Sequence, residues 1–211
     1  MPAMSAVERA LCRSLPWRAL TGRVVLPWAL DGVALAGEVL ELGSGSGTVA
    51  AELLRRFPSI RLTATDVDSA MVDSARQRLT PFGDRVEVRQ ADATALPFAA
   101  ASFDSVVSFI MLHHTLRWED VLGEAVRVLR PGGRLVGYDL VNSPPARTFH
   151  RLDRSDHRLA SADELSARLR QLPVEDVGID PALWGLVVRF RARRAGDPPA
   201  VSPVDSDEER P

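Results

Sequence analysis

The sequence predicts an α/β fold: a doubly wound, seven-stranded sheet with helices on both faces and an antiparallel last strand. Between residues 38 and 172, short apolar runs alternate with segments whose apolar residues recur at helical spacing. Such alternation favours a parallel sheet, and right-handed crossovers fix its winding. The last two apolar runs are joined by the short connection Asp180-Pro181-Ala182. That connection suits an antiparallel hairpin rather than a further crossover.

The first half of the predicted sheet is bounded by glycine and proline. Glu38–Leu42 ends in glycines and is therefore a strand that feeds a turn, and the helical pattern after it stops at Pro58. A run of alternating polarity leads to Asp66, and the next helical pattern closes at Pro81. The expected strands are 38–42, 60–65 and 86–88, and the expected helices are 48–57 and 69–79.

The second half follows the same rules. An amphipathic helix ends at Pro131-Gly132-Gly133, a tight turn before the next strand. Ser161 at the N-cap and Glu164 at position N3 form a capping box that begins another helix. The expected strands are 103–109, 134–140, 174–179 and 183–191, and the expected helices are 118–129 and 161–172.

Length and composition indicate one globular domain with short appendages. The chain has 211 residues, of which 45% are hydrophobic and 26% charged. We expect an N-terminal helical extension over 1–35, a central domain over 36–195, and a disordered acidic, proline-rich tail over 196–211.

The same composition disfavours several classes of protein. The net charge is −2, so no strongly basic face for nucleic acid is expected. No apolar run approaches the ~20 residues that span a bilayer, and charged residues interrupt the N-terminal stretch before a signal peptide could form. Cys12 is the single cysteine, which leaves no disulfide and no cysteine-based metal site. A cytoplasmic protein is the simplest interpretation.

The strongest local motif is the glycine-rich segment Glu41–Gly47, which follows the first strand. Glycines permit positive φ and leave no Cβ between the loop and a ligand, and the amides of the next helix favour an anionic group. In doubly wound, Rossmann-like sheets, ligands bind beyond the carboxyl ends of the strands. The alternative is a glycine-rich turn without a ligand, because such loops are weak motifs alone.

Asp66 ends the second strand, 19 residues after Gly47. A carboxylate there can accept both hydroxyl hydrogens of a ribose. The alternative role, capping the next helix, suits Asp68 or Ser69 better. The loop and Asp66 together indicate a nucleoside cofactor. They leave S-adenosylmethionine and NAD both open, because residues 45–50 satisfy the dinucleotide pattern G-x-G-x-x-A.

Four motifs decide between these cofactors, and they lie at 39–47, 65–71, 91–107 and 127–135. With them the sequence resembles the class I S-adenosylmethionine-dependent methyltransferases, in particular the group that includes the ubiquinone and menaquinone biosynthesis enzymes. The match runs from about 38 to 141 and continues more weakly to about 193. The resemblance implies transfer of a methyl group to a small-molecule acceptor by in-line displacement. The alternatives are an NAD(P)-dependent oxidoreductase and a non-catalytic subunit that binds S-adenosylmethionine.

The resemblance also implies roles for single residues. Glu41 and the glycine loop would hold the methionine end of the cofactor, and Asp66 would take the ribose hydroxyls. An adenine needs an apolar slot with one acceptor and one donor at its edge. Val67 and Met71 would flank it, Asp92 would accept its amino hydrogen, and the Ala93 amide would reach a ring nitrogen; for Asp92 a turn-forming role is the alternative. The full set is Glu41, Gly43, Ser44, Gly45, Gly47, Asp66, Val67, Met71, Asp92 and Ala93.

Methyl transfer demands alignment and exclusion of water more than a diagnostic catalytic residue. The weak candidates for a base are His113, His114 and Asp139, which follow or end the fourth and fifth strands. For the histidines a structural role is favoured, since a histidine at this position recurs in the family across different substrates. Asp104 and Pro131-Gly132-Gly133 lie at the opposite rim and are expected to be structural.

The stretch Pro144–Arg158 is rich in arginine and histidine. Arg147, Arg151, Arg154 and Arg158 fall on one helical face, and His150 and His157 form a second pair. A solvated face with intrahelical ion pairs is favoured over a grip on a carboxylate or phosphate. No third ligand accompanies the two histidines, so no metal is expected.

Overall fold

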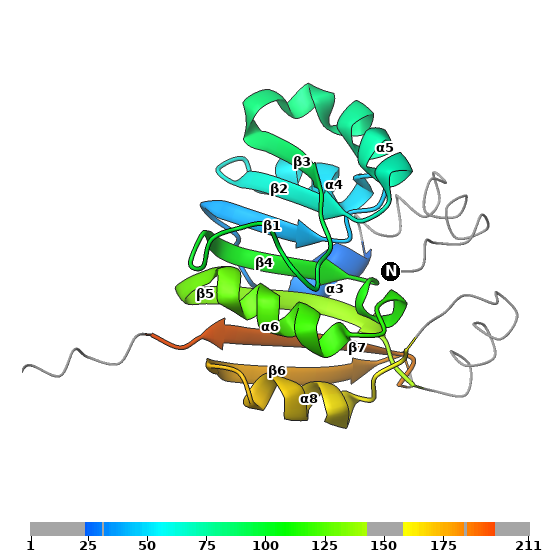
Figure 1. The fold of residues 1–211 in the computed structure, drawn as a ribbon, viewed down its shortest axis with the longest axis vertical. Coiled ribbons are helices and arrows are strands. Elements are labelled where there is room, and N and C mark those ends of the chain that lie inside the picture. Colours follow the sequence, from blue (N-terminus) through cyan, green and yellow to red (C-terminus); the bar gives the residue numbers. More distant parts are fainter. Residues whose placement is uncertain (1–23, 31, 143–157, 184, 197–211) are drawn as a thin grey trace, which may run out of the picture.

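The computed structural model describes residues 24–30, 32–142, 158–183 and 185–196. It is built on one seven-stranded sheet of order β3-β2-β1-β4-β5-β7-β6 (Figure 1). The expected number of strands is therefore confirmed. The strands are β1 (Glu38–Leu42), β2 (Arg61–Asp66), β3 (Val86–Gln90), β4 (Phe103–Phe109), β5 (Leu129–Leu140), β6 (Val174–Ala182) and β7 (Val187–Arg194).

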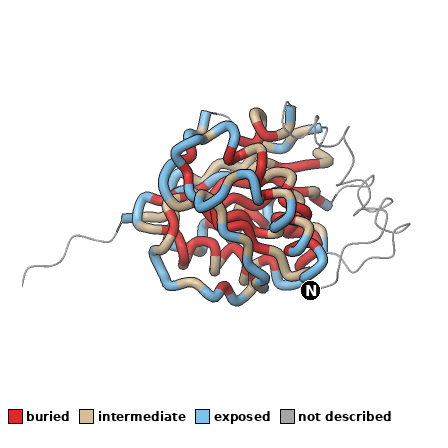
Figure 2. The backbone as a smooth tube through the Cα atoms, turned by 90° about the horizontal axis from the view of Figure 1, so that it is seen from above, coloured by how far each residue is buried: buried red, intermediate tan, exposed pale blue. Residues whose placement is uncertain are grey.

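Helices cover both faces of this sheet, as predicted. Helices α6 and α8 pack on one face, and α3, α4 and α5 pack on the other (Figure 1). Buried residues line the interior of the fold (Figure 2), and their side chains form two clusters. The described helices are α3 (Leu26–Leu30), α4 (Thr48–Arg56), α5 (Ser69–Leu79), α6 (Trp118–Val128) and α8 (Ala162–Arg170), with 3₁₀ helices η2 (Thr80–Arg85) and η3 (Leu112–His114).

Two helix starts follow directly from the sequence. The Ser161 hydroxyl accepts the Glu164 amide, and the Glu164 carboxylate accepts the Ser161 amide, so the predicted capping box of α8 is confirmed. At α5, the Asp68 carboxylate accepts the Ala70 amide at 2.8 Å. Asp68 therefore caps α5, which leaves Asp66 outside that helix.

The strand directions match the prediction. Strands β1 to β5 pair in parallel, and β7 is antiparallel to both β5 and β6. Six strands thus run one way and the last runs the other. The dinucleotide-binding order 3-2-1-4-5-6 has no antiparallel strand inserted between the fifth and sixth.

The predicted hairpin connection was wrong in its position. Asp180-Pro181-Ala182 belongs to β6, where it pairs with Arg189, Val188 and Val187 of β7. Proline is tolerated there because β6 is the last strand of the sheet, and its outer side needs no ladder hydrogen bond. The connection between the two strands lies later in the chain, between Ala182 and Val187, where Gly185 has a φ of 78°.

The turn Pro131-Gly132-Gly133 also lies inside a strand rather than before it. Strand β5 begins at Leu129, which pairs with Phe103, and the register then jumps so that Arg134 pairs with Ser105. Gly132 has a φ of 78°, which accommodates this irregularity.

Helix α3 is the described part of the expected N-terminal extension, and it packs against the sheet. Trp28 meets the Tyr138 ring edge-on at 5.7 Å, and the Arg189 guanidinium donates to the Trp28 carbonyl at 2.9 Å. Residues 1–23 and 197–211 lie outside the described residues, so the boundaries at 35 and 196 stay predictions. Within the described ranges, no helix is long and apolar enough to cross a membrane.

Candidate functional site

The carboxyl ends of β1, β2, β4 and β5 meet at one rim of the sheet because these strands are parallel and adjacent. The glycine loop follows β1, Asp66 ends β2, η3 follows β4, and Asp139 lies near the end of β5. The candidate residues predicted from separate motifs are therefore brought to one edge of the fold.

The glycine loop adopts the left-handed turn that its sequence predicts. Gly43, Gly45 and Gly47 have φ values of 66°, 52° and 75°. The Ser44 amide donates to the Thr65 carbonyl at 2.8 Å, and the Gly47 amide donates to the Ser44 carbonyl at 2.9 Å. These contacts join the loop to β2 and lead it into α4.

Glu41 is a buried acid beneath this loop. Its side chain is only 2% exposed, and its Oε2 has no hydrogen-bond partner among the described residues. Burial, and then the nearby Asp66 carboxylate, raise the pKa of Glu41 to about 8. A buried carboxyl oxygen without a donor is costly, so a native structure that retains one calls for an explanation.

Asp66 lies beside the loop and is held by two backbone amides. Its Oδ2 accepts the Gly45 amide at 2.8 Å, and its Oδ1 accepts the Asp68 amide at 2.9 Å. Burial raises the pKa of the Asp66 carboxyl, although the two amides act in the opposite direction. Each carboxylate oxygen has a second lone pair, so both remain able to accept a further hydrogen bond.

The residues expected around an adenine follow β2 and β3. Val67 is half-buried and Met71 is buried. Ala93 is buried, and the Ala91 amide donates to the Asp66 carbonyl at 2.9 Å, which ties the loop after β3 to the end of β2.

Asp92 is exposed, and its Oδ1 accepts both the amide and the hydroxyl of Thr94 at 2.8 Å. Burial opposes ionisation, but these hydrogen bonds outweigh it and lower the pKa of Asp92. The turn-forming role is present, and it occupies one oxygen only.

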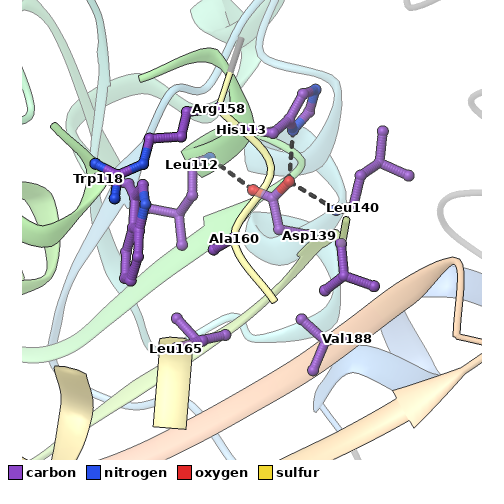
Figure 3. A pocket seen from close by; sticks show the side chains of 10 residues that line it. Leu112, His113, Trp118, Asp139, Leu140, Arg158, Ala160, Leu165 and Val188 are labelled. Atoms are coloured by element: carbon purple, nitrogen blue, oxygen red, sulfur yellow. Dashed lines mark hydrogen bonds and ion pairs between the residues drawn. The ribbon is translucent and has the colours of Figure 1, made fainter. Parts of the chain in front are cut away.

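On the other half of the rim, Asp139 and His113 form a buried pair. His113 Nδ1 lies 2.5 Å from Asp139 Oδ1, and the second ring nitrogen points away from the carboxylate (Figure 3). Asp139 also accepts three backbone amides, from Met111 at 2.8 Å, Leu112 at 2.6 Å and Leu140 at 2.7 Å. Burial opposes ionisation, but the His113 ring and these amides together lower the pKa of Asp139.

His114 is also buried, and its ring stacks on that of His113 with centroids 4.0 Å apart. The sequence placed both histidines at the rim. It did not predict that Asp139 would form a hydrogen bond with His113.

A small cavity lies beside the pair, lined mainly by apolar side chains from η3, α6, α8 and β7 (Figure 3). Its volume of about 10 Å³ holds at most one water. Arg158 lies at its border, where its amide donates to the His113 carbonyl at 3.0 Å and its guanidinium pairs with Glu119 at 2.8 Å. Arg158 is the one member of the predicted arginine row that is described; Arg147, Arg151 and Arg154, with His150 and His157, lie outside the described residues.

The opposite rim carries the acid that we expected to be structural. Asp104 Oδ2 accepts the Glu38 amide at 2.8 Å and the Arg130 guanidinium at 2.6 Å. Burial opposes ionisation, but these donors outweigh it and lower the pKa of Asp104. Asp104 therefore joins the starts of β1, β4 and β5, at the end of the sheet remote from the glycine loop.

Two contacts of the loop were missed by sequence reasoning. The Arg78 guanidinium on α5 donates to the Ser46 carbonyl at 2.7 Å. Met111 packs against Gly43 so closely that a Cβ on Gly43 would lie 2.2 Å from Met111 Cγ. Both residues look like ordinary helix or loop positions in the sequence, and only the folded chain brings them to the glycines.

Comparison with known proteins supports the resemblance to methyltransferases that the sequence motifs indicated. Residues 39–133 match a family model described as a methyltransferase domain. A ubiquinone/menaquinone biosynthesis C-methyltransferase of Desulfotalea psychrophila is 37% identical over 114 residues, which are 54% of this chain and 45% of that protein. A demethylmenaquinone methyltransferase of Thermus thermophilus is 36% identical over 129 residues, 59% of this chain and 58% of that protein. The chain thus matches about half the length of these curated relatives.

Solved structures with this fold include proteins named as putative methyltransferases. The putative methyltransferase in a Haloferax volcanii complex with the activator Trm112 aligns with a TM-score of 0.73 and 18% identity, over 92% of this chain and 99% of that one. A putative methyltransferase of Bacillus halodurans aligns with a TM-score of 0.67 and 20% identity, over 82% and 99% of the two chains. The predicted fold class and the resemblance are confirmed.

Proposed function

We propose that this chain transfers a methyl group from S-adenosylmethionine to a small-molecule acceptor by in-line displacement, because residues 39–133 match a family model of a methyltransferase domain. The unpartnered Glu41 Oε2 under the glycine loop is the observation that carries the proposal. This buried oxygen fits the ammonium group at the methionine end of the cofactor, since the ammonium N–H can donate the hydrogen bond that Glu41 Oε2 lacks.

The rest of the proposed donor site follows from the rim. Asp66 offers one lone pair on each oxygen to the ribose hydroxyls, and the free Oδ2 of Asp92 offers an acceptor to an adenine amino group. Val67, Met71 and Ala93 provide apolar surface for the ring, and Gly43, Ser44, Gly45 and Gly47 let the backbone approach the ligand.

S-adenosylmethionine supplies an already activated methyl group when bound, so the protein has to align the acceptor and exclude water. His113 is the proposed base for an acceptor that must lose a proton. Asp139 holds Nδ1 as the donor nitrogen and thereby directs Nε2 toward proton abstraction. Asp139 is a positioning residue in this scheme, because its four hydrogen bonds leave it no role of its own in proton transfer. His114 packs beside the pair as the alternative base.

The names of the curated relatives suggest where to search for the acceptor. One relative is named a ubiquinone/menaquinone biosynthesis C-methyltransferase, and the other is named a demethylmenaquinone methyltransferase. Quinone precursors are therefore the first compounds to test, followed by a metabolite extract, with methyl-labelled S-adenosylmethionine as the donor. If labelled product disappears in His113→Gln but not in His114→Gln, His113 is the base. If both variants form as much product as wild type, neither histidine acts as the base. We also propose a cytoplasmic location, which cell fractionation tests.

Ligand-induced stabilisation tests the donor. A ligand at 100 times its Kd stabilises the native state by about 2.7 kcal/mol. S-adenosylmethionine and S-adenosylhomocysteine should each raise the Tm of the purified chain, and NAD should not. Asp66→Ala should abolish the shift, whereas Asp73→Ala on the exposed side of α5 should keep it. Stabilisation by NAD alone would transfer the assignment to an oxidoreductase, and ligand binding without labelled product from any extract would favour a non-catalytic subunit.

A further inference from the structure

The glycine-rich segment Glu41–Gly47 holds two of the buried polar atoms that lack a hydrogen-bond partner. Glu41 Oε2 and Ser44 Oγ both lie here, and only Ser108 Oγ and Trp118 Nε1 share this property among the described residues. Glu41 sits on a central strand, between β2 and β4, so water does not reach its side chain. Two of these four buried atoms without partners therefore lie where a ligand is proposed to bind.

Among the residues that the structure describes, no cation is paired with Glu41. The charge of Asp66, at the end of β2, acts on Glu41 directly, and that of Asp68 in the following turn acts on Asp66. From α5, the Arg78 guanidinium donates to the Ser46 carbonyl. Helix α3 has no ionisable residue, and β4 has only Asp104, at the opposite rim.

The two neighbouring carboxyls are therefore treated differently. Asp66 receives two amide hydrogens, which favour its ionised form against the effect of burial, whereas Glu41 receives none at Oε2 and lies near the Asp66 carboxylate. Like charges that share a buried site do not both ionise readily. A proton on Glu41 removes the repulsion in the free protein, in agreement with its pKa of about 8.

We propose that Glu41 is protonated in the free protein and loses this proton when the ammonium group of the donor binds, so that donor binding is coupled to proton release. The Glu41 O–H bond breaks, the proton passes to the solvent, and the carboxylate that remains pairs with the ammonium group. This inference rests on the proposed function and adds to it a chemical step in donor binding.

The coupling has a signature whose size depends on pH. At pH 6.5 Glu41 is mostly protonated, and the amino group of the ligand is a charged ammonium ion. Binding then releases close to one proton. At pH 9 Glu41 is mostly ionised before the ligand binds, so binding releases far less than one proton.

Calorimetry of S-adenosylhomocysteine binding measures this number, since the ligand carries the same ammonium group and undergoes no transfer. At each pH the titration is repeated in two buffers of different ionisation enthalpy, such as phosphate and imidazole at pH 6.5, and the difference in heat gives the protons exchanged. Wild-type protein should release about one proton at pH 6.5 and far less than one at pH 9. Equal heats in both buffers at pH 6.5 would overturn the inference.

Two glutamine variants locate the proton. Glu41→Gln should bind about 10–100-fold more weakly, since the counter-charge is lost, and should release no proton at pH 6.5. Glu38→Gln, at the other end of the same strand, should keep the wild-type proton release. Release that persists in Glu41→Gln assigns the proton to another group and overturns the inference while the proposed function stands. No binding of either adenosyl ligand by wild-type protein overturns both.

Discussion

The two halves of the rim are built in opposite ways. In the donor half, around the glycine loop, Glu41 Oε2 and Ser44 Oγ are buried without partners. In the acceptor half, Asp139 is just as deeply buried, yet it accepts four hydrogen bonds from His113 and three amides. Around Glu41, buried oxygens are left without hydrogen-bond partners and can bind a ligand. Around Asp139, the hydrogen bonds hold a side chain in place.

The difference fits the role that we propose for each half. A ligand that arrives with its own ammonium and hydroxyl groups can complete the donor half, so incomplete hydrogen bonding in the free protein is tolerated. A base must already point at its target before the acceptor binds, so its support has to be complete without a ligand. Met111 links the halves, since its amide donates to Asp139 and its side chain packs on Gly43.

The largest expected effect comes from removing the support in the acceptor half. Asp139→Ala leaves three backbone amides, two of them buried, and His113 without their acceptor. It should lower the free energy of unfolding by about 3–5 kcal/mol in urea denaturation. Asp139→Asn, which keeps one oxygen, should fall between this variant and wild type. Asp73→Ala, an exposed helical acid, should change it by less than about 0.5 kcal/mol.

The same pair predicts a pH dependence. The pKa of Asp139 is lowered in the native state, so the unfolded state takes up this proton first as pH falls. The stabilising contribution of Asp139 is complete above the unfolded pKa of about 3.9 and is lost as pH falls through the native pKa. The difference in the free energy of unfolding between wild type and Asp139→Ala, measured by urea denaturation, should therefore become smaller in acid. A difference that becomes larger there would contradict the pairing of Asp139 with His113.

A smaller effect tests the link between the halves. Gly43→Ala places a methyl group against Met111 in a left-handed backbone conformation and should cost about 1–3 kcal/mol of stability. Gly45→Ala shares the positive φ but meets no atom within 4 Å, so it isolates the backbone strain from the steric clash. Combining Gly43→Ala with Met111→Ala should recover at least about 0.5 kcal/mol relative to additivity. Strict additivity would mean that Met111 does not couple the loops.

The smallest effect is expected at the opposite rim. Asp104→Asn keeps an acceptor for the Glu38 amide but loses the ion pair with Arg130, whose members are both partly exposed. Stability should fall by about 0.5–1 kcal/mol, and the affinity for S-adenosylhomocysteine should not change. A loss of affinity would show that the two rims are coupled through the sheet.

Local sequence patterns predicted most of the fold because its signals are local. Glycine and proline mark the ends of Glu38–Leu42 and the helix before Pro58, and the capping box at Ser161 depends on residues three apart. The hairpin was displaced because Pro181, a reliable turn signal in most contexts, is also permitted on an edge strand. Which strand lies at the edge is a property of the whole sheet.

The sequence by itself determined the alternating elements, the glycine loop and the resemblance to methyltransferases, because each depends on residue types at short, fixed spacings. Only the tertiary structure decided that Glu41 lacks a partner, that Asp139 holds His113, and that Met111 lies on Gly43. These three facts depend on contacts between strands that are distant in the chain. Burial and hydrogen bonding at such contacts set the charge of a carboxyl, and no spacing in the sequence encodes them.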